Sequence, residues 1–539
     1  MQVSIFNDVI GPVMRGSSSS HCAAALRIGR LARDLMGANI SRVLFEMDRQ
    51  GSLPTTHDSQ GSDMGLCGGL LGMDAADDGV PTSVDALRAA GMTFDVAVVD
   101  TGDPHPNTYR LTLENTDGEH HTVIAISTGG GMMEITNIDG FDVSIGGDYF
   151  ETLIFVDGLG EDVATLVQSL MPIDDVRVIQ SATEASGRRR QLVQVRAQEC
   201  ADAEVEAELR QLAPGLSLYR LRPVLPVGSR SDLKVPFSTA AELVALDGLR
   251  QSSGQPSRRL WEWAVEYEMA RGDLTEAQVL AKMVDIVRLL RASIAQGIAG
   301  TTYEDRLLGH QSGGFKRELD AGRLLNTGAL GRAVLYVTAL MEVKSSMGVI
   351  VAAPTAGACA ALPGACIAFA EELGKSEEDM ARAMLAAGAV GLFIASQWTF
   401  AAEVGGCQAE GGSAAAMAAA ALVTLADGTL PQALGASSMA LQSMLGLICD
   451  PVAGRVEAPC LGKNVIAASN AASCANMALA GYDPLIPFDE VVDAARRVAG
   501  QMPRELRCTS LGGLATTPTA LRLEAALATK RRCSTGCAC

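Results

Sequence analysis

Cysteine residues give the clearest indication of chemistry in this sequence. Three of the thirteen cysteines, Cys407, Cys449 and Cys460, stand close to Gly or Pro residues and are 42 and 11 residues apart. Because Gly and Pro favour turns and helix ends, we expect each thiol to lie at such a point and not inside a helix. Three thiolates from separate turns would suit an iron–sulfur cluster with one iron left open. Structural zinc usually takes four ligands in close Cys pairs, which are absent here, and unreactive buried cysteine is the remaining alternative.

A run of hydroxyl groups is the second candidate feature. Ser17–Ser20 precede a histidine, His21, and then a helical pattern, so hydroxyls and helix-start amides together could bind a carboxylate. A flexible linker with a helix cap would have the same composition. The segment 354–357, Pro-Thr-Ala-Gly, offers another hydroxyl and close backbone approach, with an ordinary helix start as its alternative.

Few side chains are available for acid and base catalysis, because the chain has only six histidines. His21 follows the serine run, and His105 lies between two prolines, which suits a rigidly held loop residue. A histidine in a surface loop would show the same pattern. The sequence therefore does not select the residue that removes a proton from substrate.

The elements that position these residues form a mixed fold. Short segments rich in Val, Ile and Phe predict strands at 42–46, 94–99 and 122–126, with a helix at 23–35. From about residue 152 the order is β-α-β-β-α-β, the ferredoxin-like unit, which amino-acid-binding ACT domains share with many unrelated domains. Residues 223–236 read as a linker, and beyond them helical patterns dominate.

We therefore predict an α+β fold with three domains and a tail. An α/β domain covers 1–150, a ferredoxin-like or ACT-like domain covers 151–225, and a large all-helical catalytic domain covers 237–530. A Cys-rich tail covers 531–539. The apolar stretch 347–370 is long enough to span a bilayer, but its Ala, Gly and Pro content favours a buried core segment.

Composition excludes several classes of partner. The chain of 539 residues is 48% hydrophobic and carries a net charge of −19, which argues against nucleic acid or an anionic membrane as partner. The first residues do not show the basic and apolar regions of a secretory signal. Thirteen scattered cysteines suit reduced thiols, so we expect a cytoplasmic protein. The large apolar fraction and the ferredoxin-like insert favour a homodimer.

Several motifs resemble the iron–sulfur-dependent L-serine dehydratases. The helical half resembles that family's α part, and the first 150 residues resemble its β part. The α-like motifs are Cys407-Gln-Ala-Glu-Gly-Gly-Ser, Cys449-Asp-Pro-Val-Ala-Gly, Pro459-Cys460, Val351–Gly364 and Leu511–Thr519. The β-like motifs are Ser18–His21, Arg27–Gly29, Gly51–Leu53, His105–Thr108 and Gly129–Gly131.

The resemblance implies a [4Fe-4S] cluster and dehydration of L-serine, a small amino-acid substrate, to pyruvate and ammonia. It implies that Cys407, Cys449 and Cys460 bind the cluster and that the open iron acts as a Lewis acid on the β-hydroxyl. The candidate catalytic residues are His21, His105 and His57. The candidate substrate-binding residues are Ser18, Ser19, Ser20, Asn107, Thr108, Thr355, Gly357 and Lys463.

Three departures from the family pattern put the substrate in doubt more than the reaction. Gln60 stands where the family often has histidine, with His57 three residues earlier. Lys463 follows Cys460 where arginine is usual, so a bidentate fork is lost. Lys344 stands where we expect asparagine. L-threonine, or L-cysteine losing sulfide, are alternative substrates, and a non-catalytic iron–sulfur sensor and a structural zinc protein are alternative functions.

The C-terminal tail holds three further cysteines, Cys533, Cys537 and Cys539. Cys539 combines a free carboxylate with a β-thiol, and so resembles serine with sulfur in place of the hydroxyl. We expect Cys539 to enter the pocket and bind the open iron, with a solvated tail as the alternative.

Overall fold

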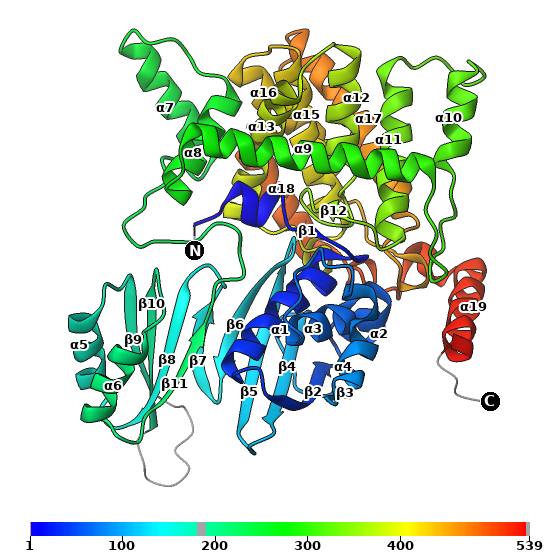
Figure 1. Cartoon of the computed structure of the whole chain (residues 1–539). Coiled ribbons are helices and arrows are strands. Elements are labelled where there is room, and N and C mark those ends of the chain that lie inside the picture. The colour runs from blue at the N-terminus through cyan, green and yellow to red at the C-terminus, as the bar shows by residue number, and fades with distance from the viewer. Residues whose placement is uncertain (1, 181–189, 535–539) are drawn as a thin grey trace.

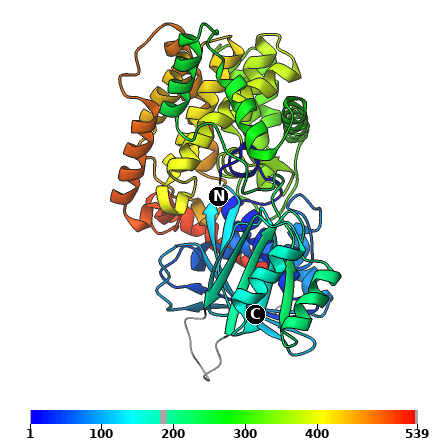
Figure 2. The same cartoon turned by 90° about the vertical axis from the view of Figure 1, so that its left-hand side faces the viewer.

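The computed structural model describes residues 2–180 and 190–534. Helices from the second half of the chain lie on one side of the molecule, and two sheets with their own helices lie on the other (Figures 1 and 2). This arrangement confirms the predicted fold class, with α/β structure first, a βαββαβ unit next and helical structure last.

The first sheet has six strands in the order β3-β2-β4-β5-β6-β7. Strands β2 and β3 are parallel, and every other neighbouring pair is antiparallel. The strands are β2 (Ile40–Asp48), β3 (Thr93–Val99), β4 (Thr108–Asn115), β5 (His120–Gly129), β6 (Met132–Ile138) and β7 (Phe141–Ile145). Buried and less buried residues alternate along β4 and β5, as expected when one face of a sheet is covered.

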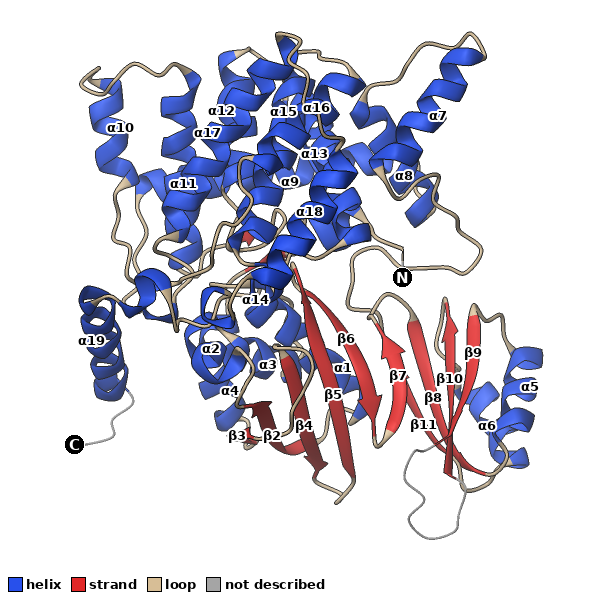
Figure 3. Ribbon diagram, turned by 180° about the vertical axis from the view of Figure 1, so that it is seen from behind, coloured by secondary structure: helices blue, strands red, loops and turns tan. Residues whose placement is uncertain are grey.

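Helices pack on this sheet in very close contact with one another (Figure 3). They are α1 (Ala24–Leu35), α2 (Leu53–Gln60), α3 (Ser62–Leu70) and α4 (Ser83–Ala89). Glycines permit the contact between α1 and α3. A Cβ on Gly69 would lie 2.0 Å from the carbonyl oxygen of Leu26, and a Cβ on Gly29 would lie 2.5 Å from that of Leu66. Any larger residue at either glycine would push the two helices apart.

The second sheet is antiparallel, with strand order β11-β8-β10-β9. Its elements are β8 (Phe150–Asp157), α5 (Gly160–Leu170), β9 (Asp175–Gln180), β10 (Arg190–Ala197), α6 (Ala203–Leu212) and β11 (Ser217–Leu221). This is the βαββαβ order that the sequence predicts. An extended connection without helix or strand then leads from β11 to Thr239.

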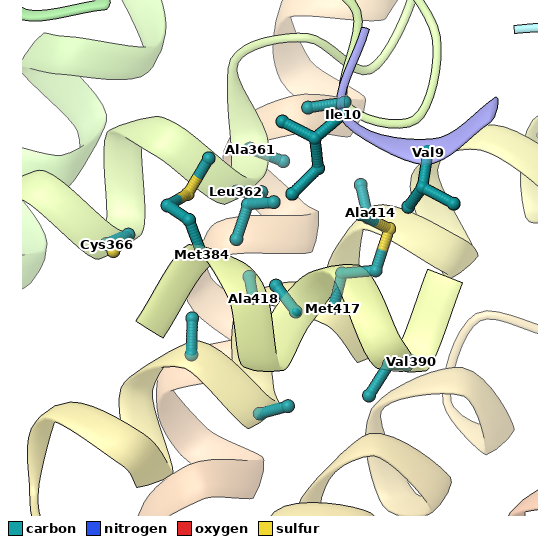
Figure 4. Close-up of a cluster of buried hydrophobic side chains, with 14 of the residues drawn as sticks. Val9, Ile10, Ala361, Leu362, Cys366, Met384, Val390, Ala414, Met417 and Ala418 are labelled. Atoms are coloured by element: carbon teal, nitrogen blue, oxygen red, sulfur yellow. The ribbon is translucent and has the colours of Figure 1, made fainter. Parts of the chain in front are cut away.

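The helical part is built around α15 (Ser413–Leu425), whose residues 414–421 are all fully buried. Small side chains let α12, α13, α16 and α17 approach this helix closely (Figure 4). The earlier helices are α7 (Ala240–Ser252), α8 (Leu260–Gly272), α9 (Glu276–Ala299), α10 (Ser312–Asp320), α11 (Ala329–Ser345), α12 (Ala361–Glu372), α13 (Glu377–Gln397) and α14 (Ala402–Gly405). The later ones are α16 (Leu430–Gln442), α17 (Cys460–Leu479), α18 (Phe488–Gln501) and α19 (Pro518–Ser534).

The segment before the first helix inserts into this helical part. A π-helical turn, η1 (Ile5–Val9), packs on α13, and β1 (Val13–Met14) pairs with the two-residue strand β12 (Ile350–Val351). Val9 and Ile10 lie beside residues of the α15 core in Figure 4. The first residues of the chain are therefore part of the helical core, which the division predicted at residue 150 did not anticipate.

A buried carboxyl group holds this inserted segment in place. Glu268 of α8 accepts hydrogen bonds from the Ser4 hydroxyl (3.0 Å) and the Ile5 amide (2.5 Å), and it is fully buried. Burial raises the pKa of Glu268 from 4.5 to about 7.

One helix, α13, is long and apolar enough to cross a membrane by length and composition. Of its most apolar 18-residue window, 78% is buried inside the protein. The predicted apolar stretch 347–370 is also buried, in β12, α12 and the loop between them. Both segments pack as core elements of the helical part.

Candidate active site and metal centre

Each predicted cysteine ligand lies at a turn or at a helix end. Cys407 falls between α14 and the π-helical turn η4 (Gln408–Gly412), and Cys460 is the first residue of α17. Cys449 lies in the loop after α16, where it forms an isolated β-bridge with Arg507. All three are buried. The loops of the helical part therefore deliver the thiols, as the neighbouring Gly and Pro residues predict.

Two of these thiols meet a carboxylate and a further cysteine. The Sγ atoms of Cys407 and Cys449 and a carboxylate oxygen of Glu410 all lie within 4.8 Å of one another. Hydrogen bonding with the thiols of Cys407 and Cys508, together with burial, raises the pKa of Cys449 well above its usual value. Burial, with Cys407 nearby, also raises the pKa of Cys460. Cys407, Cys449, Cys460 and Cys508 thus form one buried cluster, and thiolates there would need compensating positive charge.

Two lysines, one partly and one fully buried, supply positive charge to the cysteine cluster. The ammonium group of Lys463 lies 3.7 Å from the Cys407 sulfur, donates to the Ile448 carbonyl (2.7 Å) and pairs with Asp450 (2.6 Å). Burial opposes the charge of Lys463, but Cys407 and Asp450 outweigh it and raise its pKa. Lys344 is fully buried nearby and donates to a backbone carbonyl. Lys463, predicted to bind substrate, thus contacts the cysteine cluster directly.

Asn464 connects the cysteine cluster to the 354–357 loop. Its side-chain oxygen accepts from the amides of Ala360 and Ala361, at 3.2 and 3.0 Å. Its nitrogen donates to the carbonyls of Gly357 (2.8 Å) and Cys460 (2.9 Å). One buried side chain therefore satisfies four backbone groups and fixes the start of α17 against the start of α12.

The serine run meets this loop from the other half of the chain. The Ser19 hydroxyl accepts from the Ala356 amide (3.1 Å), and the Ser20 hydroxyl donates to Glu403 (2.8 Å). On the loop, the Thr355 hydroxyl donates to Glu410 (2.7 Å). Hydroxyl groups from both halves therefore converge on two glutamates next to the cysteines.

Glu410 packs against Gly357 of the 354–357 loop. A Cβ on Gly357 would lie 2.7 Å from the Glu410 carboxylate, so a larger residue there would displace that carboxylate. Burial raises the pKa of Glu410 to about 7. Glu410 follows Cys407 by three residues in the sequence, and that spacing was a signal that could have identified it. Glu403 lies in no predicted motif.

His21 is fully buried at the end of the serine run, and its hydrogen bonds identify its tautomer. The Thr56 hydroxyl donates to the Ser52 carbonyl (2.7 Å), so it must accept from His21 Nε2, 2.8 Å away. The Nδ1 atom then carries the lone pair and faces the hydroxyls of Ser18 and Ser20, each 3.1 Å away. Burial lowers the pKa of His21, so the ring is neutral near pH 7.

His105 and Asn107 lie at the start of β4, near the same site. The Nδ1 atom of His105 accepts from the Asn107 amide (3.2 Å), which leaves the proton on Nε2. Burial lowers the pKa of His105, with Glu403 as an opposing neighbour. Asn107 accepts from the Ser52 hydroxyl, and Thr108 donates to the His105 carbonyl (2.8 Å), a loop-closing contact.

His57, the third predicted catalytic histidine, lies outside this network. It pairs with Asp63 at 2.8 Å and lines a separate cavity of about 250 Å³ with Thr55 and Arg455. Gln60, which stands in place of the expected histidine, is fully buried and donates to the Cys508 sulfur (3.7 Å). The side chain of His57 thus pairs with Asp63, and its catalytic role stays a prediction.

Three buried polar atoms of this site have no hydrogen-bond partner within the described ranges 2–180 and 190–534. They are Glu403 Oε2, Gln60 Oε1 and Asn107 Nδ2. Buried polar groups are nearly always paired, so these three atoms are available to bind water or a ligand. Two acceptors and one donor suit a small molecule with both an ammonium and a carboxylate group. Cys539, also predicted to bind metal, lies outside the described residues.

Comparisons with known proteins identify relatives of this chain. The family model for the serine dehydratase alpha chain matches residues 255–515. The chain is 40% identical over 260 residues to the probable L-serine dehydratase alpha chain of Bacillus subtilis, covering 48% of this chain and 87% of that protein. It is 39% identical over 151 residues to the probable beta chain of the same organism, covering 28% of this chain and 67% of that protein.

A single-chain relative matches as well. The L-serine dehydratase of Streptomyces coelicolor is 31% identical over 290 residues, which cover 52% of this chain and 61% of that protein. The chain thus belongs to the L-serine dehydratase family and carries the family's β and α parts fused in one polypeptide.

Proposed function

We propose that this protein dehydrates and deaminates L-serine to pyruvate and ammonia with a [4Fe-4S] cluster bound by Cys407, Cys449 and Cys460. The observation that carries the proposal is the convergence of buried cysteines with the serine run and two glutamates in a member of this family. Bound there, the cluster would supply a Lewis acid that lowers the cost of expelling the β-hydroxyl group.

The residues fit a thiolate-bound iron centre. Soft cysteine sulfurs select iron–sulfur clusters or zinc over hard cations. Several thiolates in a buried site need compensating charge, which Lys463 supplies at 3.7 Å from Cys407 and Lys344 supplies from its buried position. Cys407, Cys449 and Cys460 come from three separate loops, which differs from the paired ligands of structural zinc sites.

The unpaired polar atoms suit an amino acid. We assign the substrate ammonium group to Glu403, whose Oε2 atom lacks a partner, and the carboxylate to Asn107 Nδ2. We assign to the neutral His105, protonated on Nε2, a second hydrogen bond to the same carboxylate. These groups are fixed by the fold before substrate arrives, so little ordering entropy is lost on binding.

The proton acceptor that this network favours is His21. Its Nδ1 lone pair faces the serine hydroxyls, and burial keeps the ring neutral, so it can accept the α-proton directly or through Ser18. The imidazolium that forms is stabilised by Glu403, whose carboxylate lies 3.4 Å from Nδ1. Gln60 cannot fill this role, because an amide does not accept a proton near neutral pH.

The test is an anaerobically reconstituted full-length chain, with Cys460→Ala compared with Cys474→Ala. Both cysteines are buried in α17, but only Cys460 is assigned to the centre. We expect iron and acid-labile sulfide in the wild type and in Cys474→Ala, with iron strongly reduced in Cys460→Ala. Ammonia release is measured with L-serine, L-threonine and L-cysteine. Zinc without sulfide, or ammonia from none of the three amino acids, would overturn the proposal.

We also propose that the protein works as a homodimer on small amino acids, with neither nucleic acid nor membrane as partner. The net charge of −19 supports the exclusion of polyanionic partners. Light scattering of the reconstituted protein measures the oligomeric state.

A further inference from the structure

A fourth cysteine, Cys508, is held at the metal centre by the backbone. The amide of Cys449 donates to the Leu506 carbonyl (2.9 Å), and the amide of Cys508 donates to the Cys449 carbonyl (3.1 Å). The segment that carries Cys508 is therefore joined to Cys449 by two backbone hydrogen bonds, with Arg507 as the bridge partner of Cys449. Both side chains are 3% exposed and pack with Cys407 and Ala402 in one small buried cluster.

The loop that carries Cys508 is fixed in an unusual conformation. Cys508 and Ser510 both have φ of 59°, in the left-handed region that residues other than glycine rarely adopt. Such strain persists only where the surroundings impose it, and it gathers at functional sites.

Contacts of the residues that follow Cys508 hold this loop in place. The carbonyl of Thr509 accepts from the Thr55 hydroxyl (3.1 Å), and the hydroxyl of Ser510 donates to the Pro451 carbonyl (3.3 Å). Farther along, the Leu514 amide donates to Asp450 (2.9 Å). The loop is thus attached both to α2 and to the segment that follows Cys449, and it directs the Cys508 thiol to the centre.

The Cys508 sulfur has a hydrogen-bond donor from the other half of the chain. Gln60 Nε2 lies 3.7 Å from it, and Gln60 is fully buried. An N–H group directed at a sulfur stabilises a thiolate, and it is also one of the ways in which proteins tune iron–sulfur centres. Gln60 and Cys508 therefore act as a pair at this site.

We propose that Cys508 is a fourth protein ligand of the iron–sulfur centre and binds the iron that Cys407, Cys449 and Cys460 leave open. The inference rests on the function proposed above. Four cysteine thiolates complete the usual ligand set of a [4Fe-4S] cluster. Substrate would then replace Cys508 by ligand exchange, in which the bond from iron to the Cys508 sulfur would break and a bond from iron to the substrate hydroxyl oxygen would form, without electron transfer. Gln60 would stabilise the released thiolate.

This assignment competes with the prediction that Cys539 binds the same iron. One open iron accepts one of the two thiolates in the resting cluster. Cys508 is positioned by the fold itself, whereas Cys539 lies outside the described residues.

The test compares wild type with Cys508→Ala, Cys539→Ala and Cys474→Ala, each reconstituted anaerobically at full length. A brief ferricyanide treatment removes an iron that no cysteine binds, and EPR then detects a three-iron cluster. We expect Cys508→Ala to lose one of four irons and give that signal. Wild type, Cys539→Ala and Cys474→Ala should keep all four.

Two results would overturn the inference: Cys508→Ala retaining four irons like wild type, or the three-iron signal arising in Cys539→Ala instead. If Cys508→Ala does not fold, Cys508→Ser replaces sulfur with oxygen at nearly constant size. Its reduced cluster should then give a shifted EPR spectrum, and an unshifted one would refute the assignment. A wild-type chain without iron and sulfide would refute the proposed function itself.

Discussion

Replacement of Glu268 by glutamine tests how the inserted N-terminal segment is held. Glu268 is fully buried in α8 and accepts hydrogen bonds from Ser4 and Ile5. Its nearest charged neighbours are Arg271 and Asp8, which act in opposite directions on its pKa. Because burial dominates, the folded protein favours the neutral carboxylic acid. Glutamine mimics that neutral form at every pH.

The magnitude follows from linkage between protonation and folding. The pKa of Glu268 is about 7 in the folded protein and about 4.5 in an unfolded chain. Between these values the folded state holds a proton that the unfolded state has lost, so stability falls as pH rises. At about 1.4 kcal/mol per pH unit, the loss reaches about 3 kcal/mol by pH 8. Below pH 4.5 both states are protonated and the contribution is fully retained.

Urea unfolding from pH 5 to pH 8 measures this effect, with the fluorescence of Trp261 and Trp263 in α8 as the probe. Wild type should lose about 2.5 kcal/mol more than Glu268→Gln over that range, because part of the loss has already occurred by pH 5. Any change in hydrogen bonding caused by the amide is independent of pH and cancels in the comparison. Glu490→Gln, at an exposed position, is the control and should follow wild type. Parallel pH profiles for wild type and Glu268→Gln would refute the reasoning.

Three further tests address packing, hydrogen bonding and charge, and the first and third of them include a matched control variant. Gly69→Ala places a Cβ 2.0 Å from a backbone carbonyl oxygen and should destabilise the protein by about 2 kcal/mol. Gly248→Ala, in open space within α7, should stabilise the protein by up to about 1 kcal/mol. Thermal unfolding measures both changes. Asn464→Ala leaves four backbone groups without their partner and should cost about 3 kcal/mol in urea unfolding. Lys463→Met should speed iron loss to a chelator by roughly 10- to 100-fold, and Lys375→Met, which removes an ion pair elsewhere, should leave that rate unchanged.

Much of the fold could be predicted because its signals are local. The strands at 94–99 and 122–126 are short runs of β-branched and aromatic residues, and the helices of the βαββαβ unit have clear polar and apolar faces. The placement of Cys407, Cys449 and Cys460 at turns and helix ends could be predicted for a similar reason, since each stands beside residues that end a helix or form a turn. These features depend on a few neighbouring residues and on nothing distant in the chain.

The remaining features depend on contacts between distant segments. Ile5–Val9 shows no local signal that places it against α13, because its apolar residues would suit a sheet edge equally well. Glu403 was missed because its neighbours, Ala and Val, resemble those of an ordinary helix, and only the fold brings Ser20 to it from 383 residues away.

Cys508 was not predicted, because the three tail cysteines form a more conspicuous group in the sequence. What distinguishes Cys508 from those tail cysteines is the pair of backbone hydrogen bonds that joins its segment to Cys449, together with the left-handed conformation. Neither can be seen from residue type. Gln60 leads to the same conclusion: as a replacement for histidine it suggests a lost proton relay, but in the fold it is the donor to the Cys508 sulfur. Gln60 and Cys508 therefore form one feature of the site, and substitution of either residue should perturb the same iron.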